Sequence, residues 1–437
     1  MSRTTFVLAA AILLSLLSTG MAQVGVPSWK ELMASGKEAF SLLKADDAIK
    51  HLDAALKAVP QEPLTLPNRI EMHRIRALAH ELRQDEKSAI VDQSRRLGLS
   101  EELHGKTHFN LIDPLKRLAR LSARTQDLKA AIAYQRRAII LQDKVPAGSS
   151  AAKLSLLHDL AKFQRSAGEH AEAVVSIQTY IDEISKEKGK LHSDLTQPLT
   201  LIADSYRILG NYKAAIAAIT KRIAIFESVR KRRNDPSIAS DLARIAELEI
   251  ADARPDDAQK TCDRWRKILN SVTDKHPELW RLHEMQAEIA RFKGDRKRES
   301  EQLREGIKYS TDFYGSTNVR VGRFHRKLSE SLRAQNENEA AFEAATKAVA
   351  VFEKRLRAQD PQTMDAIIER GHCQLALGKT KAAATSFRKV LRAWEKQAGP
   401  KHRILRKPLE GLLKLAKLAG DVDQIKELKA RLTSLVK

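Results

Sequence analysis

Cysteine, aromatic residues and long apolar stretches are all scarce in this chain of 437 residues. It has two cysteines, Cys262 and Cys373, and an aromatic content of 5%. A small disulfide-stabilised domain is excluded, because such folds need several cysteine pairs. The few aromatic side chains leave no regular series of platforms for stacking nucleic-acid bases. We therefore expect two free, partly buried thiols, and we do not expect nucleic acid as a partner.

Motifs that carry chemistry are also missing. The chain has no His-Glu-x-x-His pair, no glycine-rich phosphate loop and no Gly-x-Ser-x-Gly elbow, and neither cysteine belongs to a Cys-x-x-Cys motif. His80 with Glu81 and His283 with Glu284 lie in amphipathic stretches, where such neighbours are usually surface residues. We predict a protein that is not an enzyme and that has no cofactor and no metal.

The one long apolar run lies at the N-terminus. Arg3 precedes an apolar stretch over residues 6–17, and Gly20-Met21-Ala22 is typical of a cleavage site. Residues 1–22 are predicted to be a secretory signal peptide, because the apolar stretch is too short to span a bilayer as a lone helix. We expect no transmembrane segment in the mature chain and a periplasmic or secreted location. The short, alanine-rich signal favours a bacterial source.

What the chain has in abundance is a repeat. A small residue recurs every 41 to 43 residues at Ala48, Ala89, Ala131, Ala173, Ala215 and Ala258, and then at Ala341 and Ala383. Glu299 and Ile425 occupy the remaining slots of the series. Such a period is typical of a helical repeat array, in which each unit buries its apolar face against its neighbours.

A second small position precedes the first in each repeat. Nine of its ten residues are small: Gly36, Ala77, Ala119, Ala161, Ala203, Ala246, Ala287, Ser329 and Gly371, with Leu413 in the last repeat. Together with Leu52, Ala55 and Pro60, this pattern resembles the tetratricopeptide repeat, and the length of about 42 residues resembles the extended repeats of kinesin light chains. The resemblance implies an all-α, right-handed α-α superhelix (a solenoid) of about ten helix hairpins.

We place this array over residues 23–437. The repeats are predicted at 29–62, 70–103, 112–145, 154–187, 196–229, 239–272, 280–313, 322–355, 364–397 and 406–437. Arg96 in repeat two and Glu299 in repeat seven depart from the pattern, and Leu413 and Ile425 mark repeat ten as a terminal cap.

A polar residue stands eleven positions before the small position of the first helix in many repeats: His108, His192, Asp235, His276, Asp360 and His402. Proline follows three of them, and a polar cap with proline at the first helical position signals a helix start. Four histidines in one slot also suggest a metal. Capping is preferred, because successive linkers are too far apart to share an ion.

In tetratricopeptide proteins the first helix of each repeat lines a concave groove. Carried over by register, the resemblance predicts groove residues for a partner segment: Lys116, Arg120, His158, Lys162, Arg165, Arg207, Arg291, Arg326 and Arg333. Acidic groove residues are expected at Glu247, Glu284, Glu288 and Glu330. The asparagines of the family's carboxylate clamp are replaced by Arg120, Lys162 and Asp204, so that specific clamp is not expected.

The formal net charge of +22 favours anionic partners. We predict an exported scaffold or adaptor that binds acidic protein or peptide segments in a basic concave groove. The alternative is a charge-driven binder of anionic polymers or membrane surfaces. Groove charges that are only solvated remain a third interpretation, and the sequence carries no indication of an oligomeric state.

Overall fold

The computed structural model describes residues 27–145, 150–231, 235–273 and 276–435. The predicted signal peptide lies outside these residues. The chain divides into two compact units, residues 1–190 (unit 1) and 191–437 (unit 2). In the described ranges all regular elements are helical, and successive helices pair into ten hairpins. The prediction of an all-α array of about ten helix hairpins is therefore confirmed.

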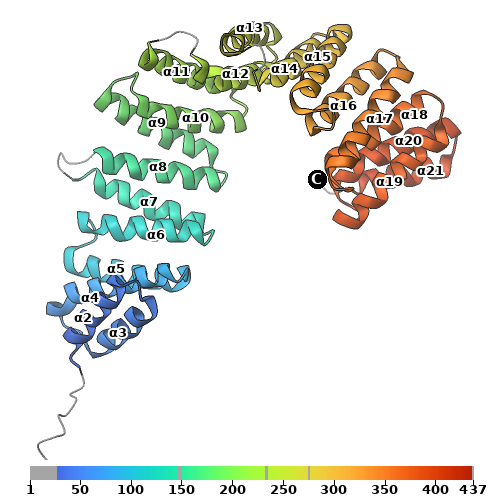
Figure 1. Cartoon of the computed structure of the whole chain (residues 1–437). Helices are drawn as coiled ribbons and strands as arrows, with labels where there is room; N and C mark the ends of the chain where they lie inside the picture. The colour runs from blue at the N-terminus through green and yellow to red at the C-terminus, as the bar shows by residue number, and fades with distance from the viewer. Residues whose placement is uncertain (1–26, 146–149, 232–234, 274–275, 436–437) are drawn as a thin grey trace, which may run out of the picture. The chain divides into compact units, whose positions relative to one another are not determined.

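In unit 1 the hairpins follow one another along the chain (Figure 1). Their helices are α2 (Trp29–Ser41), α3 (Ala45–Ala58), α4 (Leu66–Leu82), α5 (Glu86–His104), α6 (Ile112–Arg124), α7 (Leu128–Gln142), α8 (Ser150–Ser166) and α9 (His170–Lys188). Short 3-10 turns, η1 (Pro63–Thr65) and η2 (Phe109–Leu111), lead into α4 and α6. Even-numbered helices are the first helices of their hairpins, and odd-numbered helices are the second.

Unit 2 continues the same alternation. It contains η3 (Ser193–Leu195), α10 (Thr196–Ile208), α11 (Tyr212–Arg230), η4 (Pro236–Ile238), α12 (Ala239–Ala251), α13 (Pro255–Val272), α14 (Leu279–Phe292), α15 (Arg296–Tyr314), α16 (Val319–Ala334), α17 (Asn338–Arg355), α18 (Pro361–Ala376), α19 (Thr380–Ala398), η5 (Arg403–Leu405), α20 (Arg406–Ala419) and α21 (Val422–Thr433). None of the helices in the described ranges is both long and apolar enough to cross a lipid bilayer.

The two small positions of the repeat lie where paired helices touch. Ala48, Ala131 and Ala215 are fully buried, as are Ala77 and Ala119 on the first helices. At Gly371 an added Cβ would come within 2.8 Å of the Phe387 ring. Small side chains are needed here because the partner helix approaches closely, and interiors are packed without spare volume. The two cysteines are free and buried, more deeply than the sequence suggested.

The linker residues act as helix caps. The side chains of His108, His192, Asp235, His276, Asp360 and His402 each accept a hydrogen bond from the backbone N–H two residues on, over 2.8–3.2 Å. Asn318 makes the same contact in repeat eight, where the sequence pattern had not marked it. The capping role is confirmed, because each cap satisfies a backbone N–H at the start of a helical segment that has no partner within it.

Candidate functional site

The first predicted groove residues lie on α6 in unit 1, and both are engaged by the next repeat. Arg120 forms an ion pair with Asp159 on α8, with 2.9 Å between Nη2 and Oδ2. The Nζ atom of Lys116 lies 3.5 Å from the hydroxyl of Ser155 on α8. These two cations therefore join neighbouring first helices, and a partner segment would have to compete with those contacts.

The three predicted residues of α8 differ from one another in exposure. The His158 ring packs against Tyr180 of α9, with 6.0 Å between ring centroids. Burial lowers the pKa of His158, and the nearby Lys162 adds to that effect. Lys162 is exposed, whereas Arg165 is half-buried. Of the three, Lys162 is the side chain most open to a partner.

Arg207 belongs to unit 2, whereas the predicted residues of α6 and α8 belong to unit 1. It is exposed on α10 and lines a hollow of about 310 Å³ with Tyr212, Arg244 and Glu247. Arg244 is paired with Asp204, and Glu247 is paired with Arg281 at 3.0 Å. Arg207 is thus a cation in the lining of a separate hollow that is partly apolar.

Ion pairs between successive first helices recur along unit 2. Lys327 on α16 lies 2.7 Å from Glu284 and 2.9 Å from Glu288 of α14, and Arg323 lies 3.4 Å from Glu284. Of the acidic groove residues expected from the register, Glu247, Glu284 and Glu288 are therefore paired with cations of the next repeat. These pairs are half-buried and therefore remain partly screened by solvent. They also reduce the charge that remains available to a partner.

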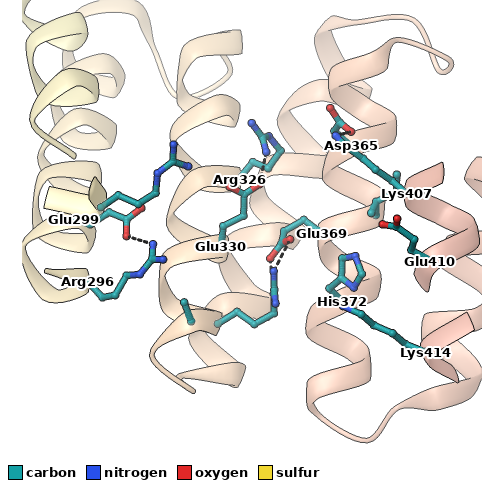
Figure 2. Close-up of a pocket in the computed structure, with 14 residues that line it drawn as sticks. Arg296, Glu299, Arg326, Glu330, Asp365, Glu369, His372, Lys407, Glu410 and Lys414 are labelled. Carbon is teal, nitrogen blue, oxygen red and sulfur yellow. Dashed lines mark hydrogen bonds and ion pairs between the residues drawn. The ribbon is translucent and has the colours of Figure 1, made fainter. Parts of the chain in front are cut away.

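A hollow of about 460 Å³ gathers the last three predicted residues (Figure 2). Arg291 comes from α14, and Arg326 and Arg333 come from α16. Figure 2 shows side chains from α15, α18 and α20 completing the walls. We call this hollow the charged groove. Its charged lining residues are Arg291, Arg296, Arg326, Arg333, Lys407 and Lys414, with Glu299, Glu330, Asp365, Glu369 and Glu410.

Most of these charges are paired inside the charged groove. Arg333 contacts both carboxylate oxygens of Glu369, at 2.9 and 3.3 Å. Arg296 pairs with Glu299 at 2.8 Å, and Lys407 pairs with Asp365 at 2.7 Å. Arg326 pairs with Glu330 one turn along α16. The charged groove is therefore lined by both cations and carboxylates, whereas the net charge alone predicted a basic surface.

Two buried carboxylates anchor the floor of the charged groove. Glu299 and Glu369 are each only 5% exposed. Ser331 donates a hydrogen bond to Glu299 over 3.0 Å, and Ser329 donates to Glu369 over 3.4 Å. Buried carboxylates need such partners, because an unpaired buried charge is costly. Arg296 and Arg333 are thereby held in place at the groove wall.

Three exposed charged residues have no ion-pair partner within the described residues: Arg291, Lys414 and Glu410.

Burial raises the pKa of Glu330, and the neighbouring Glu369 adds to that rise. Burial lowers the pKa of His372 to about 4, with contributions from Arg333 and Lys414. His372 is therefore neutral at pH 7, and the unpaired cations are Arg291 and Lys414.

Several lining residues were missed by the sequence reasoning. His372, Glu410 and Lys414 follow the same first-helix register that predicted Arg291 and Arg326, so extending that register through repeats nine and ten would have found them. Arg296 and Glu299 lie on the second helix α15, where the groove register gives no signal. Glu299 was noted only as a departure from the small-residue pattern, and the structure gives its reason.

Comparisons with known proteins find similarity to this chain among solved structures. No family model matches the sequence, and no curated protein matches it. Among solved structures, a tetratricopeptide repeat protein from Parabacteroides merdae is 17% identical and covers 68% of this chain and 98% of its own, with a TM-score of 0.43.

Two further structures are similar in the same way. Nearly identical TPR-like repeats assigned to a kinesin light chain of Podosopora anserina are 16% identical, covering 46% of this chain and 95% of that one at a TM-score of 0.41. The apo form of RapI is 14% identical and covers 80% of this chain and 94% of its own at 0.42. Because all three TM-scores are below 0.5, the partner of this chain has to be argued from its own residues.

Proposed function

We propose that this protein is an exported, non-enzymatic scaffold that binds acidic segments of partner proteins in the charged groove. Stacked helix hairpins offer extended surfaces suited to holding partners. The observation that carries the proposal is the presence of Arg291 and Lys414 at the charged groove without an ion-pair partner in the described part of the chain. Acidic side chains along one segment can meet these two cations, on α14 and α20, without breaking an internal pair.

Pre-positioned arginines favour this interpretation. Arg296 and Arg333 are oriented by buried Glu299 and Glu369, so little side-chain entropy is lost when a ligand carboxylate approaches. Arginine also presents a planar set of donors that matches a carboxylate with two hydrogen bonds. The groove should therefore prefer aspartate- or glutamate-bearing segments over neutral ones.

The test is the binding of a labelled glutamate-rich peptide to the full mature chain, followed by fluorescence anisotropy. The double variant Arg291→Glu/Lys414→Glu is expected to weaken binding by about tenfold or more, because it removes two attractive charges and adds two repulsive ones. The matched control is Lys308→Glu/Lys354→Glu, which makes the same change in net charge at exposed positions on second helices. Equal losses from both doubles would refute the groove.

The same peptide-binding assay tests whether α6 and α8 of unit 1 belong to a binding surface for acidic segments. Arg120→Glu/Lys162→Glu is expected to weaken binding of an acidic segment by more than the control double, if the segment also runs along α6 and α8. Because Arg120 is paired with Asp159, the Lys162 change should account for most of the loss. A loss no larger than that of the control removes α6 and α8 from the binding surface.

Export is the second part of the proposal and rests on the sequence of residues 1–22. Amino-terminal sequencing of the protein from its native source is expected to begin at Gln23. A chain that retains Met1 and its apolar run would contradict cleavage.

The alternative function is charge-driven binding of anionic polymers or membrane surfaces, which the net charge of +22 favours. Such binding falls steeply as salt increases, whatever the ligand's sequence. A peptide site in the charged groove retains part of its affinity in moderate salt and discriminates among peptides of equal charge. Affinity capture with elution in rising salt therefore separates the two functions.

A further inference from the structure

A third hollow, distinct from the charged groove and from the hollow at Arg207, lies between α19 and the last hairpin. Its volume is about 350 Å³, and we call it the terminal groove. Its lining comprises Thr380, Lys381, Ala384 and Arg388 of α19, Leu412, Leu415, Leu418 and Ala419 of α20, and Gln424 of α21. We propose that the terminal groove docks an acidic, amphipathic helix of a partner protein.

The apolar floor has the spacing of a helix-binding surface. Leu412, Leu415 and Leu418 follow one another at three-residue intervals on α20, so they share one face of that helix. Their exposure rises along the row, from 9% at Leu412 to 72% at Leu418. An apolar row of this kind, bordered by a second helix, leaves a channel into which a third helix can place its own apolar face.

A small residue opens this groove. Ala384 on α19 occupies the repeat position that is filled by Ile49 in repeat one, Ile132 in repeat three and Phe342 in repeat eight. Leu415 also differs from its counterparts, since Leu121 and Leu248 are almost fully buried whereas Leu415 is half-exposed. The array therefore leaves apolar surface here that equivalent positions of other repeats cover.

The charge around the terminal groove selects the partner. The lining contains Lys381 and Arg388 and no carboxylate. The segment 379–435 as a whole carries fifteen lysine and arginine residues against five acidic ones. Opposite charge at the rim of an apolar contact raises the association rate and excludes wrong partners. A helix with leucines on one face and glutamates beside them complements both features.

A second copy of this chain is a poor occupant, because the excess of cations would face the same excess on its partner. A flat anionic bilayer is disfavoured as well, because it complements a protruding apolar surface and not a concave channel. The concave shape and the cationic rim together favour the helix of an acidic partner.

The experiment uses the full mature chain and a labelled helical peptide with leucines at every third and fourth position and glutamates beside them. A second peptide replaces each glutamate by glutamine and retains the apolar face. We expect saturable binding of the acidic peptide and about tenfold weaker binding of the glutamine peptide. Ala384→Phe is expected to reduce affinity by about tenfold or more by filling the channel, and it should fold because repeat eight accommodates Phe342 at the equivalent position.

Two charge variants complete the test. Lys381→Glu/Arg388→Glu is expected to weaken the acidic peptide about tenfold, whereas Lys308→Glu/Lys354→Glu should change its affinity less than about twofold. Arg291→Glu, which changes the charged groove outside the segment 379–435, should also leave it nearly unchanged, which separates this site from the charged groove. Absence of saturable binding, or undiminished binding to Ala384→Phe, overturns the proposal. The proposal is also overturned if Ala384→Phe abolishes binding to phosphatidylglycerol vesicles and leaves binding of the peptide unaffected. A concentration-dependent dimer that Ala384→Phe dissociates would overturn it as well.

Discussion

Arg96 and Glu299 occupy positions where most repeats carry a small residue. Each is accommodated by a charged partner: Arg96 pairs with Asp113 on the next helix at 2.8 Å, and Glu299 pairs with Arg296 one turn earlier on its own helix. Burial lowers the pKa of Arg96, opposed by its bond to Asp113. A larger polar residue can thus replace a small one when its charge is satisfied, which a sequence pattern of small residues does not reveal.

One tight packing site at the residue scale involves Phe387, which is fully buried between α18 and α20. A Cβ added at Gly411 would lie 2.6 Å from its ring, and one added at Gly371 would lie 2.8 Å from it. We predict that Gly411→Ala destabilises the protein by about 1–3 kcal/mol, because the enclosed ring cannot move aside. Urea denaturation measures the change.

Gly98 supplies the control, because it lies inside α5 with open space around its Cα atom. Gly98→Ala should stabilise the protein by about 0.5–1 kcal/mol through helix propensity alone. Addition of Phe387→Leu should recover part of the loss in Gly411→Ala. A stabilised Gly411→Ala variant would mean that the packing around Phe387 is looser than described.

At the scale of elements, the turn inside each hairpin contains one residue in the left-handed conformation. Glycine occupies it at Gly168, Gly210, Gly294, Gly378 and Gly420, with φ between 68° and 78°. Other residues adopt the same conformation at Leu43, Gln84, Gln126, Ala253 and Asn336, with φ between 57° and 66°. Non-glycine residues there carry a steric cost, so half of the turns are strained relative to the others.

Leu43→Gly tests this turn. Leu43 is 74% exposed, so its side chain contributes little packing, and its φ is 59°. We predict that the free energy of unfolding increases by about 0.5–1 kcal/mol. Glycine removes the steric cost of the left-handed conformation, but its greater flexibility in the unfolded chain offsets part of that gain. Thermal denaturation measures it, and Gly210→Ala should show the opposite sign. A destabilised Leu43→Gly would indicate an unrecognised role for the exposed leucine.

At the scale of the whole molecule, the net charge is a poor measure of the charge that is available to bind a partner. The net charge of +22 suggests a uniformly basic surface. The structure instead pairs many first-helix cations with carboxylates of neighbouring repeats, as with Arg120, Lys327 and Arg333. The cations that remain unpaired, such as Arg291 and Lys414, are therefore more informative about binding than the total.

Acid stability is a second property of the whole molecule, and the buried histidines of unit 2 control part of it. Burial lowers the pKa of His325 and of His372 to about 4, with Lys347 adding to the effect at His325 and Arg333 at His372. An unfolded histidine has a pKa of about 6.5. Between these values the unfolded chain binds more protons than the folded one. The stability due to the neutral histidines is therefore complete above about pH 6.5 and decreases as the pH falls toward 4.

We predict that the unfolding midpoint of unit 2 decreases between pH 7 and pH 5. Each histidine contributes at most about 1.4 kcal/mol per pH unit within its window. Urea denaturation of the wild type and of His325→Gln/His372→Gln at both values isolates this contribution, because carboxylates such as Glu330 titrate in both proteins. A double variant whose midpoint falls as much as that of the wild type would exclude the histidines as the cause.

The candidate sites show which features the sequence could predict. Arg291, Arg326 and Arg333 were found because a first-helix register repeats along the chain, and His372 and Lys414 obey the same register. Arg296 was not predictable in this way, since it reaches the groove from the second helix α15. The terminal groove was also not predictable, because it depends on how Ala384, Leu415 and Leu418 are covered in space.

The sequence alone determined the class of the fold. The period of small residues, the polar caps such as His108 and Asp360, and the turn glycines each act within one hairpin, where local geometry decides the outcome. Only the tertiary structure decided which charges stay unpaired and which apolar faces stay open. Those outcomes depend on side chains about one repeat apart in the chain, whose contacts exist only after the hairpins stack.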